Sequence, residues 1–295
     1  MPMKCLLHLM LALAFCARAG AADALRVSSF PTILTEIATE VGGGRVSVHA
    51  HLKPGVDPHD FQPKPDDLRT VAKAQIVLLS AKHLEAYVGK LKEATGSRAV
   101  FVEVGDAMPS LRLTVEHGDH SHDGEDPHWW HSIANMRRAT KIVRDAFIAA
   151  SPGDRATFTA NAARYLTALD TLHAWTKAKL AELPRSSRKL VTSHDAFQYF
   201  ARDYGFTIYA IDGLSTADQP SSGKVARIIA AIRAQGVKAV FPESIENPKV
   251  LREITRESGA KVGPVLYADG LGEGDARTYA GMFRHNVTAI VAALK

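Results

Sequence analysis

Cysteine is nearly absent from this 295-residue chain, which contains only Cys5 and Cys16. Both precede residue 22, in a segment where Lys4 is followed by a largely apolar run from Leu6 to Phe15 and then by small residues. This pattern predicts a secretory signal peptide over residues 1–21, too short for a stable membrane anchor, and a periplasmic mature protein. The mature chain would have no thiol and no disulfide, so any metal site must use histidine and carboxylate.

A lipid anchor and a nucleic-acid partner are both disfavoured. Phe15 precedes Cys16 where a lipoprotein signal requires a small residue, so we expect no lipid on Cys16. The net charge of +5 falls to +3 once Lys4 and Arg18 are removed, because no acidic residue precedes Asp23. No run of lysine and arginine follows, and this excludes the electrostatic footprint of a nucleic-acid-binding protein.

Catalytic motifs are also absent. The chain has no His-Glu-x-x-His, no Gly-x-Ser-x-Gly and no P-loop. These motifs would place a zinc-bound water with its base, a nucleophile or a phosphate cradle. We therefore expect a protein that is not an enzyme, and a zinc-dependent hydrolase is the less favoured alternative.

What the chain does contain is an alternation of short apolar runs and helical patterns. The intervening segments carry apolar residues at intervals of three and four, as crossover helices of parallel sheets do. This predicts an α/β fold with two similar lobes, residues 22–151 and 184–295, each a four-stranded, mostly parallel sheet flanked by helices. The expected strands are Leu25–Phe30, Arg45–His51, Gln75–Ser80 and Ala99–Val104, then Arg188–Ser193, Phe206–Ile211, Val237–Phe241 and Val262–Ala268.

A long helix is expected between the lobes. Ser151-Pro152 resembles a helix start, and an apolar stripe runs from Phe158 to Leu183 before Pro184 ends the pattern. A helix over 152–183 would be nearly 50 Å long at about 1.5 Å per residue and would cross both lobes. This predicts one rigid linker helix; two shorter helices with a break are the alternative.

Histidine is concentrated between residues 116 and 131, which hold five of the chain's thirteen histidines. Imidazole is the commonest nitrogen ligand of zinc. The Gly/Ser-rich run 117–126 is expected to be a flexible loop whose His117, His120 and His122 form a secondary zinc-capture site. A solvated loop with incidental histidines is the alternative.

Four further side chains qualify as metal ligands by position: His59, His128, His194 and Asp269. Each follows a predicted strand, with a long loop before His128, and ligands of open α/β sheets bind beyond the carboxyl ends of the strands. We therefore expect two ligands from each lobe to meet in the cleft between them. Taken singly, each histidine also fits an ordinary core or surface position, and Asp269 fits a helix cap.

Four sequence blocks around these residues resemble the zinc/manganese solute-binding proteins of bacterial ABC importers, the cluster A-I or ZnuA-like family. They are Asp57-Pro58-His59, Asp126-Pro127-His128, Leu190–Phe197 and Leu266–Asp269. The resemblance covers nearly the whole mature chain. It implies two α/β lobes joined by one rigid helix, delivery of a divalent metal to a membrane permease, and metal ligation by His59, His128, His194 and Asp269.

The donor set indicates the cargo. Three imidazoles and one carboxylate form a closed tetrahedral set that suits Zn²⁺, whereas manganese members of this family place a carboxylate where His194 stands. We expect zinc, with manganese as the alternative cargo and water as the alternative to Asp269. An adhesin or a metal sensor would be a different use of the same fold.

The remaining expectations concern partners and neighbouring side chains. We expect a monomer that docks on a permease and receives zinc from a periplasmic metallochaperone. Trp129 and Trp130 are expected to be core anchors beneath His128, and His131 to orient Trp130 or to contact a ligand from outside. A structural role is expected for the other histidines, His49, His51, His83, His173 and His285.

Overall fold

The structure is a computed structural model that describes residues 23–117, 120–215, 220–244 and 249–295, with the backbone alone at 113–117, 120–123 and 249. The expected signal peptide and its Cys16 lie outside the described residues. Within the described residues, no helix is both long enough and apolar enough to cross a membrane.

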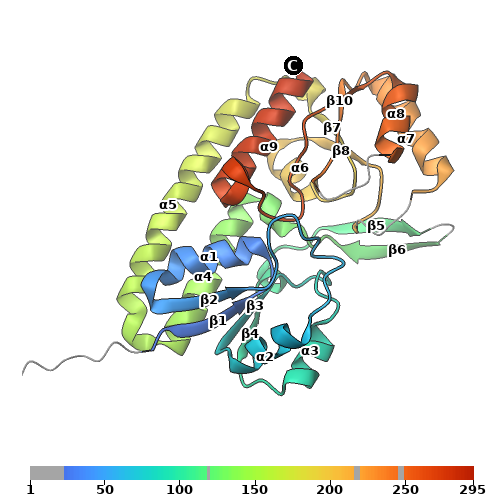
Figure 1. Cartoon of the computed structure of the whole chain (residues 1–295). Coiled ribbons are helices and arrows are strands. Elements are labelled where there is room, and N and C mark those ends of the chain that lie inside the picture. Colours follow the sequence, from blue (N-terminus) through green and yellow to red (C-terminus); the bar gives the residue numbers. More distant parts are fainter. Residues whose placement is uncertain (1–22, 118–119, 216–219, 245–248) are drawn as a thin grey trace, which may run out of the picture.

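The N-terminal lobe is built on a parallel sheet with strand order β2-β1-β3-β4 (Figure 1). β3 has only buried apolar residues, as expected for an inner strand covered on both faces. Helices α1 and α4 cover one face of the sheet, and α2 and α3 cover the other. The elements are β1 (Leu25–Ser29), α1 (Thr32–Gly42), β2 (Val46–Ala50), α2 (Pro65–Lys73), β3 (Ile76–Leu79), α3 (Val88–Thr95), β4 (Val100–Glu103) and α4 (Ile133–Ala150).

The C-terminal lobe repeats this plan with strand order β10-β9-β7-β8, again parallel. Two four-stranded parallel sheets flanked by helices confirm the predicted fold class. The elements are β7 (Lys189–Thr192), α6 (Gln198–Tyr204), β8 (Thr207–Ala210), α7 (Ser222–Gln235), β9 (Ala239–Phe241), α8 (Lys249–Ser258), β10 (Lys261–Val262) and α9 (Tyr279–Leu294).

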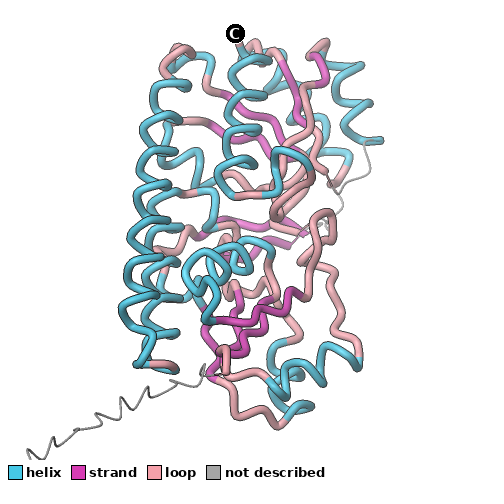
Figure 2. Tube along the Cα trace, turned by 60° about the vertical axis from the view of Figure 1, so that its left-hand side comes forward, coloured by secondary structure: helices cyan, strands magenta, loops and turns pink. Residues whose placement is uncertain are grey.

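Helix α5 (Arg155–Leu180) runs along one side of the molecule past both sheets (Figures 1 and 2). The predicted long helix is thus present without a break, although its first turn, Pro152–Asp154, is a 3-10 turn. Its buried stripe packs against α1 and α4 of one lobe and α9 of the other. One hydrophobic cluster therefore continues through α5 from the first lobe into the second.

A carboxylate on α1 ties the lobes together. Glu36 Oε1 accepts a hydrogen bond from the Tyr165 hydroxyl of α5 at 2.7 Å, and Oε2 accepts one from the Tyr279 amide of α9 at 2.5 Å. Burial raises the pKa of Glu36, and the two hydrogen bonds only partly offset this. The two lobes are therefore joined by hydrogen bonds as well as by a shared hydrophobic core.

The histidine-rich stretch differs from the expected flexible loop. Arg112–His117 (β5) pairs antiparallel with His120–Glu125 (β6), and Arg112 lies opposite Glu125. Figure 1 shows this hairpin between the two lobes, on the side away from α5. Period-2 alternation from Arg112 to Glu116 carries the strand signal, and backbone pairing across the hairpin outweighs the Gly/Ser content. Residues 118 and 119 lie outside the described residues.

Candidate metal centre

The four predicted ligands converge at one place between the lobes. His59 comes from the loop after β2, His128 from the turn after β6, His194 from the end of β7, and Asp269 from the segment after β10. Their donor atoms all lie within 4.8 Å of one another. The side chains of His128 and His194 are fully buried, Asp269 is 1% exposed and His59 is 8% exposed.

The distances between donor atoms have the scale of a zinc tetrahedron. The Nε2 atom of His128 lies 3.2 Å from His59 Nε2 and 3.3 Å from His194 Nε2. Asp269 Oδ1 lies 3.2 Å from His59 Nε2, 3.4 Å from His128 Nε2 and 3.3 Å from His194 Nε2. Zinc bonds of about 2.0–2.1 Å give tetrahedral edges of about 3.3–3.4 Å. The four atoms are therefore spaced to surround one such ion.

Carboxylates on the outer side of two imidazoles fix their orientation. Asp126 Oδ1 lies 2.8 Å from His128 Nδ1, and Glu243 Oε2 makes a close contact with His194 Nδ1. When the ring is neutral, the proton on Nδ1 donates to the carboxylate, and the lone pair of Nε2 faces the centre. These contacts select the tautomer that can bind a metal.

Electrostatics at the centre reflect the close approach of acids and imidazoles. Burial by itself would lower the pKa of His194, but the carboxylates of Glu243 and Asp269 outweigh it and raise that pKa well above 6.5. The pKa of His128 is also raised, because hydrogen bonds to Asp126 and Asp269 exceed the effect of burial. Burial favours the neutral form of Asp269, yet the three histidines lower its pKa well below 3.8. The close approach of these groups thus favours the ionised form of Asp269 and the protonated forms of His128 and His194.

Local sequence explains how two of the histidines are held. In both Asp-Pro-His segments the aspartate accepts a hydrogen bond from the amide two residues ahead. The Asp57 Oδ1 to His59 N distance and the Asp126 Oδ1 to His128 N distance are both 2.8 Å. This is an Asx turn, and the intervening proline restricts the backbone further. The same three-residue unit presents a candidate ligand on each of two different loops.

The two tryptophans and His131 support the centre from the core side. Trp129 and Trp130 are 0% and 1% exposed, in agreement with their predicted role as anchors. Trp130 Nε1 and His131 Nε2 each donate to the carbonyl oxygen of Ala268 at 2.8 Å, and burial lowers the pKa of His131 to about 3. Because Ala268 immediately precedes Asp269, neutral His131 acts through the backbone rather than through a carboxylate.

Sequence reasoning did not single out Glu243. This residue follows β9 and, besides contacting the His194 ring, accepts hydrogen bonds through Oε1 from the amides of Ser193 at 3.1 Å and His194 at 3.3 Å. The signal was its position: an acidic residue just after the buried strand Ala239–Phe241, next to the strand that carries His194.

The predicted capture histidines lie on the hairpin that leads into this centre. β6 ends at Glu125, directly before Asp126 and the His128 turn. The backbone of His117, His120 and His122 is paired in the hairpin, and the side chains of these residues lie outside the described part of the structure.

Comparison with known proteins agrees with this geometry. Residues 27–293 match the family described as zinc-uptake complex component A, periplasmic (ZnuA). The chain belongs to the ZnuA family. It is 32% identical over 280 residues to the manganese-binding lipoprotein MntA of Bacillus subtilis, covering 92% of this chain and 90% of MntA. It is also 32% identical over 271 residues to the zinc-binding protein TroA of Treponema pallidum, covering 89% of this chain and 86% of TroA.

A solved structure shares the fold of this ZnuA-family chain. The periplasmic zinc-binding protein TroA from Treponema pallidum superimposes with a TM-score of 0.84 at 29% identity, covering 92% of this chain and 99% of TroA. The family consists of metal-binding components of transport systems, so the prediction that this chain is not an enzyme is confirmed.

Proposed function

We propose that this ZnuA-family protein binds one Zn²⁺ through His59, His128, His194 and Asp269 and delivers it to the permease of an ABC importer. The observation that carries the proposal is the set of donor-atom distances of 3.2–3.4 Å, which fits zinc bonded to all four atoms. The distance of 3.2 Å between Asp269 Oδ1 and His59 Nε2 supports Asp269 rather than water as the fourth ligand.

The nitrogen-rich donor set and the contacts of the neighbouring carboxylates with the ligand histidines favour zinc over manganese. Manganese prefers oxygen-rich, octahedral coordination, and zinc accepts a tetrahedral set of nitrogen and oxygen donors. Three of the four converging donors are imidazole nitrogens. Glu243 and Asp126 each have an oxygen engaged with the outer nitrogen of a ligand histidine. Relatives named for each metal show that ancestry alone does not decide the cargo.

The cargo can be tested by competition. We expect the purified protein, stripped of metal and dialysed against equal free concentrations of Zn²⁺ and Mn²⁺, to retain close to one zinc and almost no manganese per chain. Elemental analysis measures both ions at once. A His194→Asp variant, which replaces an imidazole with a carboxylate, is the matched comparison and should shift the ratio toward manganese. Preferential retention of manganese by the unmodified protein would contradict the proposal.

We also propose that the β5-β6 hairpin captures zinc for the central site. Its three histidines lie on the segment that enters the His128 turn, so an ion held there would be released close to the cleft. A metallochaperone is the expected zinc donor, and the chain is expected to act as a monomer after export to the periplasm. The family's place in an uptake complex supports a membrane partner.

Replacing His117, His120 and His122 with serine should slow zinc transfer from a dilute chelator complex while leaving one tightly bound ion at equilibrium. Stopped-flow measurement of chelator release gives the rate, and equilibrium titration gives the stoichiometry. Serine keeps the backbone polar and the hairpin pairing intact. Identical transfer rates before and after replacement would exclude a capture role for the hairpin.

A further inference from the structure

A second group of metal-binding side chains lies away from the cleft, in the N-terminal lobe. His49 projects from β2, His51 directly follows the end of that strand, and Asp67 comes from the first turn of α2. Each offers one donor atom within 4.8 Å of the others. The sequence alone gave these two histidines a structural role, and His51 does stack on Phe30 with a centroid distance of 4.1 Å.

His51 is held in an arrangement that can exchange a proton for a metal. Its Nδ1 lies 2.7 Å from Asp67 Oδ1, and its Nε2 lies 2.5 Å from Ser28 Oγ. A serine hydroxyl can donate or accept a hydrogen bond. If the ring proton moves from Nδ1 to Nε2, Ser28 changes from donor to acceptor, and Nδ1 becomes free to bind a cation beside Asp67. In this exchange Asp67 gains the cation as a partner, and the Ser28 hydroxyl accepts a hydrogen bond from Nε2 instead of donating one to it.

The ionisation states also suit a cation. Burial lowers the pKa of His51 below 6.5, more than the neighbouring carboxylate raises it, so the ring is neutral near pH 7. Burial would raise the pKa of Asp67, but hydrogen bonds from His51 and from the Lys64 amide outweigh it and keep the carboxylate ionised. A neutral imidazole and a carboxylate are the forms that ligate zinc.

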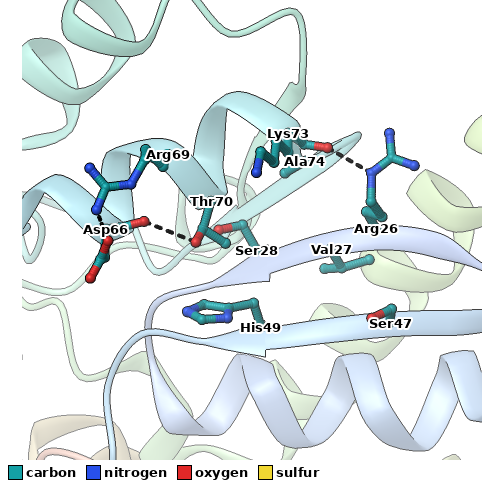
Figure 3. A pocket seen from close by; sticks show the side chains of 10 residues that line it. All are labelled: Arg26, Val27, Ser28, Ser47, His49, Asp66, Arg69, Thr70, Lys73 and Ala74. Carbon is teal, nitrogen blue, oxygen red and sulfur yellow. Dashed lines mark hydrogen bonds and ion pairs between the residues drawn. The ribbon is translucent and has the colours of Figure 1, made fainter.

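The third donor opens the group to solvent. His49 is exposed, and its ring centroid lies 4.7 Å from that of His51. It lines a cavity of about 560 Å³ between the strands β1 and β2 and helix α2, and the helix contributes Arg69, Thr70 and Lys73 to the lining (Figure 3). The cavity is lined by His49 and by Ser28, whose hydroxyl bonds His51, so an ion can enter beside the exposed ring of His49 and one coordination position would be left to solvent.

We propose that His49, His51 and Asp67 form a second, weaker Zn²⁺ site at the surface of the N-terminal lobe, independent of the central site. Two imidazoles and one carboxylate are a borderline-soft donor set, which selects zinc over the hard cations. The distance between His51 Nδ1 and Asp67 Oδ1 must increase from 2.7 Å to about 3.3 Å to admit the ion. The cavity also contains basic side chains, although Arg69 is paired with Asp66 and Arg26 donates through Nε to the Lys73 carbonyl. These positive charges weaken zinc binding at this site, so we expect zinc to fill the central site first.

The test uses the full chain with His117, His120 and His122 replaced by serine, which removes the hairpin histidines as competitors. We expect calorimetric titration with zinc alone to show a tight first equivalent and a weaker second one. His49→Ala should abolish the second equivalent and leave the first unchanged, because His49 is exposed and contributes nothing to the cleft. His285→Ala is the matched control, since this partly exposed histidine bonds the Val265 carbonyl outside either group.

Two results would overturn the inference: the absence of a weak zinc equivalent in the hairpin-substituted protein, or a weak equivalent that persists in His49→Ala. Absence of the tight equivalent would instead contradict the proposed transport function, and the surface site would still be tested by whether His49→Ala removes the weak equivalent. His51→Gln removes another of the three proposed ligands. The melting temperature of this variant without metal shows whether a loss of zinc binding is caused by a loss of folding.

Discussion

Saturating zinc is expected to raise the free energy of unfolding by roughly 4 kcal/mol when its free concentration is about a thousandfold above the dissociation constant. For a chain of this size, this corresponds to roughly 8–16 °C in melting temperature, at about 2–4 °C per kcal/mol. The effect arises because the four donors are brought together only in the folded protein. His59 and Asp269 are 210 positions apart in the sequence, so an unfolded chain cannot offer the same cage.

His128→Ala should remove most of this zinc-dependent increment. His128 Nε2 lies within 3.4 Å of a donor atom from each of the other three ligands, so its loss opens the tetrahedron. The increment is the quantity to compare, because replacing a buried imidazole also changes the stability of the metal-free protein. Thermal melts with and without zinc measure it, and His173→Ala, on the exposed face of α5, is the control. Equal increments in His128→Ala and the unmodified protein would refute the ligand assignment.

Zinc affinity is expected to fall steeply as the pH is lowered. The raised pKa values of His128 and His194 mean that zinc must displace a proton from each. Where both rings are protonated in the metal-free protein, affinity should drop by about 100-fold per pH unit, since each displaced proton contributes about tenfold. Titration with a competing chelator at several pH values gives this slope. A slope near zero across the range in which the metal-free rings titrate would contradict the assignment.

Glu243→Gln separates an electrostatic role from a purely structural one. Removal of this carboxylate takes away an interaction that raises the pKa of His194, so the steep part of the pH dependence should move to lower pH. Affinity above that range should still fall by about 10–100-fold, because a neutral amide oxygen is a weaker acceptor for the His194 ring than a carboxylate. If zinc affinity dropped while the pH profile stayed in place, the role of Glu243 would be only to orient the His194 ring.

The metal-free protein should respond to pH in the opposite sense. A histidine whose pKa is raised on folding contributes stability that is present below the unfolded value, about 6.5, and is lost as the pH rises through the folded value. Asp269, whose pKa is lowered, contributes stability above about pH 3.8 that is lost only as the pH falls toward its folded value. Melting temperatures without metal should therefore decline from mildly acidic to alkaline pH, while the increment from zinc grows.

Strand positions were predictable because local pattern and tertiary environment agree. The expected strand Arg45–His51 became Val46–Ala50, with turn residues on both sides fixing its limits. The last strand is the exception, since only Lys261–Val262 pairs as a strand, followed by an isolated bridge between Glu243 and Leu266. Pro264 has no amide hydrogen for the ladder, and a side chain at Gly263 would meet the Phe241 ring at 2.7 Å.

The convergence of the four ligand candidates was predictable for a different reason. Parallel sheets bring the carboxyl ends of their strands to one edge. Residues that directly follow these strands in the sequence are therefore expected to lie close together in the fold. The partners of the ligands were harder to predict. Glu243 follows a predicted strand in the sequence, but its contact with His194 depends on which strands are neighbours. The Trp130 bond to Ala268 depends on how the lobes meet, which no local pattern encodes.

The continuous core along α5 has a consequence for how the ion leaves. Swinging the lobes apart would expose a packed stripe that runs from Phe158 to Leu180 and would break the Glu36 bonds to Tyr165 and Tyr279. For the proposed delivery of zinc, we therefore expect the ion to leave by stepwise detachment of its ligands, beginning at His59, whose side chain is the most solvent-accessible of the four candidate ligands. A permease that displaced the loop carrying His59 could release the ion while the two lobes kept their relative positions.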